Sequence, residues 1–346
     1  MSARRIFLDR GIGETRGVVT LDGRPERLIL RRDEDDPRLL LGSRLVARVA
    51  SLEPALATAF LDLGEGAEAI LPFRPDSRPV RGEVLEVEIR GEPRRGKLAV
   101  ARLIQPAEGS PRILESAADV AAELRRLVKD EPLVEGPQAR QVADEAEAEA
   151  LEILHSLPGG GTLAIEPTRA LTAIDVDLGE RKGADAKRVA RQANLAALGM
   201  SARLLRLKGL GGIVVIDLVG RGHDGTALMA AARQAFAPDN PGVAIGPVGR
   251  FGTMELSLPR RSRPLAEILC REDGALSDRT LAQHLVRRLE AEGLAQPGAR
   301  LRATCAPALA VRAAPLLARL AEKMGARFSL QPDPSIAREG FRVGPL

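Results

Sequence analysis

Two apolar stretches of similar sequence decide the fold of the middle of this chain: LTAID at residues 171–175 and IVVID at residues 213–217. Each has the length and apolar character of a short buried strand. A helical pattern over residues 184–198 lies between them, and further strand and helix patterns follow. Strands that alternate with helices predict an α/β sheet. Asp175 and Asp217 then stand at the carboxyl ends of strands, which is the edge where such sheets bind ligands.

If these two strands are neighbours, their terminal carboxylates repel each other, and a divalent cation with oxygen ligands relieves the repulsion. Mg²⁺ fits such ligands best, with Mn²⁺ as the alternative. Asp177 lies two residues after Asp175 and projects from the same strand face, so it can supply a third oxygen. A metal ion here would polarise a phosphodiester and activate a bound water. For each aspartate taken singly, a role in a turn or a helix cap is the alternative.

Basic residues outnumber acidic ones in this part of the chain. Residues 158–263 carry 15 basic and 9 acidic side chains, although the whole chain has a net charge of only +4. Arg181 and Lys182 follow the first pair of aspartates, and Arg206 and Lys208 precede a glycine-rich turn. We expect these four cations to bind phosphates beside the carboxylates. Solvated loop charges are the alternative interpretation.

The flanking segments have other patterns. Residues 4–9 and 17–30 predict a β-hairpin that turns at Asp22 and Gly23. Five short β-type segments between residues 43 and 104 predict a small barrel. Helical spacing begins at Ile113, and the chain beyond residue 263 predicts a small α+β unit. Its expected elements are helices near 279–292 and 308–324 and a strand at RFSLQPD.

Composition excludes several classes of protein. With 45% hydrophobic and 28% charged residues and no apolar run near the ~18 residues of a membrane span, we expect a globular protein with no membrane partner. The N-terminus lacks the apolar run of a signal peptide, and the two cysteines suit a reducing compartment, so we expect a cytoplasmic location. Seven phenylalanines are the only aromatic residues, so any binding of nucleic acid must depend mainly on charge.

Several longer segments resemble the ribonuclease E/G family of endoribonucleases. They are GGGTLAIEPTRALTAIDVDLG (159–179), QANLAALG (192–199), LRLKGLGGIVVIDLVG (205–220), RFGTMELS (250–257), FLDRG (7–11) and ATAFLDLGEGAEAILPF (57–73). The resemblance implies an α+β multidomain fold. Its expected parts are a ribonuclease-H-like domain (1–35 and 107–157), an OB-fold RNA-binding barrel inserted in it (36–106), a DNase-I-like catalytic domain (158–262) and a small C-terminal domain (263–346).

The resemblance also implies an activity and its residues. Family members cleave single-stranded RNA and leave a 5′-phosphate and a 3′-hydroxyl, and the two metal-binding aspartates fall on Asp175 and Asp217. In the barrel we expect Phe60 and Lys97 to contact RNA, whereas the family's second RNA-contacting phenylalanine falls on Ile70. We therefore expect a Mg²⁺-dependent endoribonuclease of RNA processing or decay. The alternative is a non-catalytic RNA-binding or ribosome-associated protein of the same descent.

Three departures from the family pattern modify these expectations. Asp177 replaces an asparagine, which would alter the preference for the metal ion. The segment that senses a 5′-monophosphate is expected to be missing, and Gly242 stands where its arginine would be. The family's zinc-binding cysteine pair has no counterpart besides Cys270, so we expect no structural zinc. A homo-oligomer would therefore have to form through other surfaces.

Overall fold

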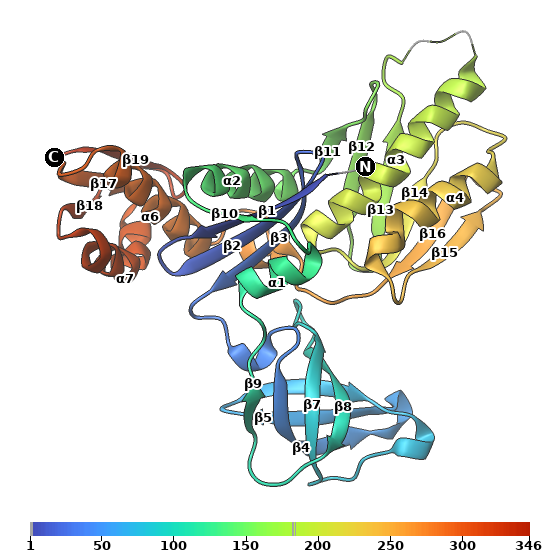
Figure 1. Cartoon of the computed structure of the whole chain (residues 1–346), viewed down its shortest axis with the longest axis horizontal. Coiled ribbons are helices and arrows are strands. Elements are labelled where there is room, and N and C mark those ends of the chain that lie inside the picture. The colour runs from blue at the N-terminus through green and yellow to red at the C-terminus, as the bar shows by residue number, and fades with distance from the viewer. Residues whose placement is uncertain (1–2, 182, 184) are drawn as a thin grey trace.

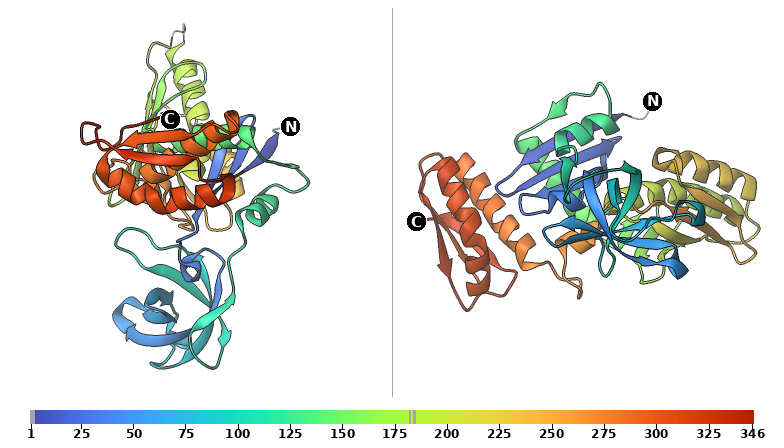
Figure 2. Two further views of the ribbon diagram at one scale, coloured as in Figure 1. Left: turned by 90° about the vertical axis from the view of Figure 1, so that its left-hand side faces the viewer. Right: turned by 90° about the horizontal axis from the view of Figure 1, so that it is seen from below.

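The computed structural model describes residues 3–181, 183 and 185–346, and these form four β-sheets and seven α-helices. The N-terminal sheet lies at the centre of the molecule in Figure 1, with the barrel below it, a larger α/β sheet to the right and the C-terminal unit to the left. The left view in Figure 2 shows that the barrel stands apart from the other sheets. Within the described residues, no helix combines the length and the apolar character needed to cross a membrane.

The N-terminal sheet joins two segments that are distant in the sequence. Its strands are β1 (Arg4–Arg10), β2 (Glu14–Leu21), β3 (Arg24–Arg32) and β10 (Leu133–Val134), and β10 runs parallel to β1. The helices α1 (Val120–Leu127) and α2 (Pro137–Leu151) pack against it. Asp22 and Gly23 have φ angles of 51° and 78° between β2 and β3. Two positive φ angles are typical of a type I′ hairpin, so the predicted turn is confirmed.

The barrel contains the five predicted strands. They are β4 (Arg44–Glu53), β5 (Thr58–Gly64), β6 (Ala67–Pro72), β7 (Val84–Gly91) and β8 (Ala99–Pro106). Their order is β5-β6-β8-β7-β4, and pairing of β4 with β5 closes the sheet into a barrel that is consistent with an OB fold. A further strand, β9 (Arg112–Glu115), pairs with β4 beyond the expected end of the barrel at residue 106.

A buried carboxylate fastens the barrel to the rest of the molecule. Glu92 follows β7 and pairs with Arg31 on β3 at 2.9 Å. It also accepts a hydrogen bond from the backbone N–H of Arg263 at 3.0 Å, in the segment that follows the α/β sheet. Because Glu92 is only 7% exposed, this joint is held in a low-dielectric setting where a lost partner is costly.

The α/β sheet has the order β11-β12-β13-β14-β16-β15. Its strands are β11 (Leu154–Ser156), β12 (Thr162–Pro167), β13 (Thr172–Asp177), β14 (Gly212–Asp217), β15 (Ala244–Val248) and β16 (Thr253–Leu258). The two helices α3 (Ala186–Lys208) and α4 (Gly225–Phe236) cover one face (Figure 1). β13 and β14 are parallel neighbours, and the other pairings are antiparallel. The predicted alternation of strands and helices is therefore present.

Helix α3 continues to Lys208, whereas the sequence pattern predicted its end at residue 198. Gly199 weakens a helix by about 1 kcal/mol relative to alanine, which is why the pattern suggested an end there. Burial of Leu204, Leu205 and Leu207 against the sheet outweighs that cost. The helix stops at Gly209, whose φ of 68° is the left-handed cap that glycine adopts readily.

The C-terminal unit has its own apolar core and contains more strands than the sequence predicted. Its helices are α6 (Asp278–Ala295) and α7 (Pro307–Met324), and its sheet has the order β18-β17-β19. The short helix α5 (Leu265–Leu269) precedes them and packs into the core of the α/β sheet. The strands are β17 (Leu301–Cys305), β18 (Phe328–Pro332) and β19 (Phe341–Pro345). The expected helices and β18 are present, whereas β17 and β19 were not predicted.

Candidate active site

Asp175 and Asp217 are register partners on the parallel strands β13 and β14. Neighbouring strands lie about 4.8 Å apart, and register partners direct their side chains to the same face of the sheet. Both aspartates are exposed, while Ile174 and Ile216 beside them are buried on the face that the helices cover. The two carboxylates therefore stand side by side on the open face of the sheet.

Neither carboxylate has a structural role in the described part of the chain. The side chains of Asp175 and Asp217 make no hydrogen bond or ion pair with any described residue. Asp185 and Asp224, in contrast, cap α3 and α4 by accepting hydrogen bonds from backbone N–H groups. The cap or turn role that is the usual explanation for such an aspartate does not apply to the pair on β13 and β14.

Asp177 lies on the same open face, but its carboxylate is engaged in a turn. Its Oδ1 accepts a hydrogen bond from the backbone N–H of Gly179 at 2.7 Å. Across residues 3–181, 183 and 185–346, no three His, Cys, Asp or Glu side chains come together as a metal cage. The expected third metal ligand is therefore not part of a three-carboxylate cluster, and Asp175 and Asp217 remain a candidate pair of ligands.

Antiparallel β16 places one more carboxylate on this face, which the sequence reasoning missed. Thr253 pairs with Asp217, and Glu255 pairs with Val215. Glu255 is exposed and lies diagonally across from Asp217, at the roughly 7–8 Å typical of such neighbours. The alternation of polar and apolar residues in TMELSL (253–258) was the signal that could have found it.

A cation-lined cavity of about 350 Å³ lies at the carboxyl end of the same strands. It is formed by the first turns of α3 and α4 and by the loop that follows Asp217. The basic residues that line it are Lys187, Arg188, Arg191 and Arg221. Asp185 and Asp224 balance part of this charge, and Arg191 pairs with Asp224 at 3.4 Å. The remaining positive charge is suited to a phosphate group.

Arg206 forms ion pairs within the protein and stabilises the fold, whereas the sequence predicted that it binds RNA. Its guanidinium donates to Asp239 at 2.7 Å and pairs with Glu26 at 2.9 Å, and its side chain is 6% exposed. Arg206 is in the last turn of α3, just before β14, and therefore lies at the amino end of that strand, about 16 Å along it from Asp217. The expectation that Arg206 flanks the carboxylates is therefore wrong.

Lys208 also has a structural partner. Its Nζ donates to the carbonyl oxygen of Ala150 at 3.0 Å, and to that of Glu152, so it caps the carboxyl end of α2. Burial lowers the pKa of Lys208 to about 8, although Glu149 and Glu152 oppose the shift. As with Arg206, the expected phosphate-binding role is not supported, because the ammonium group is enclosed at the far edge of the sheet.

Arg181 lies near the carboxylates but closes a turn. Its Nε donates to the carbonyl oxygen of Gly160 at 2.6 Å, and Pro158 supplies a second carbonyl. This contact holds the turn before β12 next to the end of β13. Lys182, the other cation expected here, lies outside the described residues.

The barrel carries the expected RNA-contacting residues on its surface. Phe60 is half-buried, and its register partner on β6 is Ile70. Both alternate with the core residues of their strands and therefore point out of the barrel. Lys97 is exposed in the connection between β7 and β8, whereas Phe73 packs against the barrel core.

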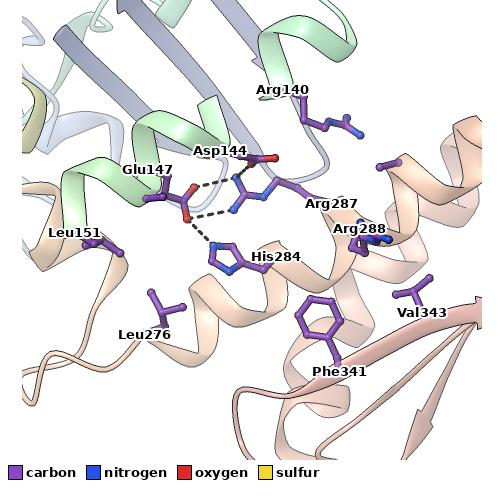
Figure 3. Close-up of a pocket in the computed structure, with 12 residues that line it drawn as sticks. Arg140, Asp144, Glu147, Leu151, Leu276, His284, Arg287, Arg288, Phe341 and Val343 are labelled. Atoms are coloured by element: carbon purple, nitrogen blue, oxygen red, sulfur yellow. Dashed lines mark hydrogen bonds and ion pairs between the residues drawn. The ribbon is translucent and has the colours of Figure 1, made fainter. Parts of the chain in front are cut away.

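A second cavity, of about 750 Å³, lies between α2, α6 and β19 (Figure 3). Several of its charged side chains form hydrogen bonds and ion pairs with one another. Glu147 accepts hydrogen bonds from His284 at 2.5 Å and from Arg287 at 3.0 Å, and buried Arg16 pairs with the same carboxylate. This network joins the C-terminal unit to the N-terminal sheet and contains neither aspartate of the pair.

Two adjacent carboxylates that have no partner among the described residues form a site of the kind that holds a divalent ion. The cation-lined cavity lies at the same end of the strands, but among the helices α3 and α4 that cover the opposite face. Residues 108–261, which include both aspartates, match the family model described as Ribonuclease E/G family. Ribonuclease E of Haemophilus influenzae is 36% identical over 152 residues, which cover 40% of this chain and 16% of that protein. The segment 108–261 of this chain is therefore similar to the ribonuclease E/G family.

Two further relatives have the same relationship to the chain. Ribonuclease E of Escherichia coli is 34% identical over 148 residues, covering 40% of this chain and 14% of that protein. Ribonuclease G of Escherichia coli is 29% identical over 126 residues, covering 36% of this chain and 26% of that protein. The matched segment is thus a small part of each relative.

Proposed function

We propose that this protein is a metal-dependent endoribonuclease that cleaves single-stranded RNA and leaves a 5′-phosphate and a 3′-hydroxyl. The observation that carries the proposal is the register pairing of Asp175 with Asp217 on an open sheet face, within the region that matches the family. We place this activity in cytoplasmic RNA processing or decay. An open face suits a polymeric substrate, because a long strand can lie across it without entering a closed pocket.

The donor set fits a hard divalent cation. Mg²⁺ is commonly bound by one or two carboxylates together with water and substrate phosphate, so Asp175 and Asp217 suffice. When bound, the ion supplies a water of lowered pKa and neutralises charge on the phosphodiester. The chain itself orients the two carboxylates through the β13–β14 pairing. Arg188 and Arg221 would hold neighbouring phosphates at the edge of the same strands.

The barrel supplies a second contact with the strand in this proposal. Phe60 offers one outward aromatic face, and Lys97 offers an exposed cation. With Ile70 beside Phe60, one stacking surface expected from the family is missing, which favours affinity that depends on charge. Because Gly242 offers no cation for a 5′-phosphate, we expect RNAs with 5′-monophosphate and 5′-triphosphate ends to be cleaved at similar rates.

The test is cleavage of a fluorescent single-stranded RNA by the purified chain, with Mg²⁺ or with chelator. Asp175→Asn and Asp217→Asn should each lower the rate at least about 100-fold, because each removes a charged ligand of the ion. Glu322→Gln, which removes an exposed carboxylate on α7, is the matched control and should cleave as the parent does. Sequencing of the product ends checks the 5′-phosphate.

Cleavage that survives the chelator, or that is unchanged in both asparagine variants, would refute the site. If the RNA is bound but never cleaved by the parent protein under either condition, the non-catalytic RNA-binding alternative is the correct one.

A further inference from the structure

The turn between β15 and β16 is fixed beside Asp217. Gly252 donates its backbone N–H to the carbonyl oxygen of Gly249 at 3.0 Å, which closes a tight turn around Arg250 and Phe251. The carbonyl oxygen of Gly252 accepts a hydrogen bond from Leu218, the residue after Asp217, at 3.1 Å. The ladder between β14 and β16 thus extends past the carboxylate and holds the turn within about 10 Å of it.

Phe251 is the most exposed of the seven phenylalanines. It is 78% exposed, whereas the other six phenylalanines, all in the described part of the chain, are buried or half-buried. The guanidinium of Arg250 lies over its ring, 4.6 Å from the centroid. Other apolar side chains in the described part of the chain are equally exposed, but Phe251 alone among them combines a guanidinium over its ring with a turn that is fixed next to Asp217. This combination suits a ligand that stacks on the ring.

We propose that Phe251 and Arg250 form a stacking platform for one nucleobase of single-stranded RNA, next to the phosphodiester held at Asp217. This inference rests on the proposed function and adds a binding contact to it. Every base has a π face that stacks on an aromatic ring or a guanidinium plane, so the platform needs no base-specific hydrogen bond. Arg221, in the loop after Asp217, is placed to meet the phosphate of the same nucleotide.

A nucleobase fits this surface better than a protein partner does. A stable protein interface needs a contiguous surface of about 1,000 Å² or more with an apolar centre. Phe251 instead projects from a turn of glycines and arginine. One exposed ring with one cation over it matches the size and the charge of a single nucleotide.

The test measures binding of a fluorescent single-stranded RNA in chelator, so that cleavage does not interfere. Phe251→Ala and Phe251→Leu should weaken binding roughly 5- to 100-fold, the range reported for loss of one base stack. Phe251→Trp should bind at least as well as the parent protein. Val311→Ala, which trims a residue of 77% exposure on α7, is the matched control and should not change the affinity.

A set of RNAs with a single abasic site at successive positions locates the stacked base. The parent protein should lose affinity for one abasic position near the cleaved bond, and Phe251→Ala should be insensitive at that position. Unchanged affinity in Phe251→Ala, or full affinity in Phe251→Leu, would overturn the platform. Failure of the proposed function appears differently, as cleavage that does not depend on Asp217. A parent protein that binds no RNA at all overturns both.

Discussion

The carboxylates of Asp175 and Asp217 share one face of two parallel strands because those residues are register partners. A pair of like charges at this separation is destabilising by itself, so a bound cation should stabilise the folded protein. The melting temperature of the parent protein should therefore rise when Mg²⁺ or Mn²⁺ is added. Asp175→Asn and Asp217→Asn should melt at or slightly above the parent temperature without metal and lose most of the rise. Thermal unfolding measures both effects, and an undiminished rise in the variants would contradict the site.

The two substitutions available at Asp177 separate a turn role from a metal role. Asp177→Asn keeps an oxygen that can accept the hydrogen bond of Gly179, so stability and cleavage should stay near the parent values. Asp177→Ala removes the acceptor and should lower the free energy of unfolding by about 1 kcal/mol. Urea unfolding and the cleavage rate are the measurements. A large loss of Mg²⁺ affinity in Asp177→Asn would instead make this residue a ligand.

Arg206→Ala should act on stability and not on RNA binding. It removes a partner of the buried carboxylate of Glu26 and of the half-buried carboxylate of Asp239. We expect the free energy of unfolding to fall by about 2–4 kcal/mol. This is less than the full penalty for breaking a buried ion pair, because Arg4 still pairs with Glu26. Urea unfolding measures the loss, and the control Arg288→Ala, at an exposed helical ion pair, should cost about 0.5 kcal/mol or less. Weaker RNA binding with unchanged stability would show the opposite role.

Arg221→Gln should reduce the dependence of RNA binding on salt. Each phosphate contact to a single strand contributes about 0.7 to the slope of log affinity against log salt, through release of counterions. Loss of one contact at the cation-lined cavity should lower the slope by about that amount. Arg302→Gln, an exposed residue on β17, should leave the slope unchanged. Titrations at four or more salt concentrations give both slopes, and equal reductions in the two variants would argue against a local contact.

The buried imidazole of His155 makes stability depend on pH. Burial, helped by nearby Lys208, lowers the pKa of His155 below its usual value. As pH falls through about 6.5, histidine in the unfolded chain binds a proton while native His155 stays neutral. The free energy of unfolding should therefore decrease between pH 7.5 and 5.5. His155→Leu should lose less stability than the parent over this interval in urea unfolding, and an equal loss would show that other groups account for it.

The sequence predicted correctly those features that depend on a single strand or turn. The apolar character of LTAID and IVVID predicted two short strands that end at Asp175 and Asp217, and an aspartate–glycine turn predicted the first hairpin. The five barrel strands were recognisable from their glycine and proline boundaries. These signals are local, because strand periodicity and turn geometry depend on residues that are close in the chain.

The length of α3 and the positions of the charged side chains depend on contacts between residues that are far apart in the chain. Gly199 indicated an end to α3, and only packing of its last turns against the sheet shows that the helix continues. Arg206 and Lys208 lie in these last turns, at the amino end of β14. Their partners come from distant segments, since Arg206 pairs with Glu26 and Lys208 donates to the carboxyl end of α2. These roles become known only when the helix is placed against its neighbours.

By itself, the sequence determined which residues could form the carboxylate pair, because the apolar side chains of each stretch predict a strand that ends at an aspartate. The tertiary structure decided that the pair shares one open face and that Asp177 serves a turn. It also brought Arg221 and Phe251 to the same edge as Asp217. Register between strands and the docking of loops bring together residues that are far apart in the chain, so their positions become known only when the sheet is assembled.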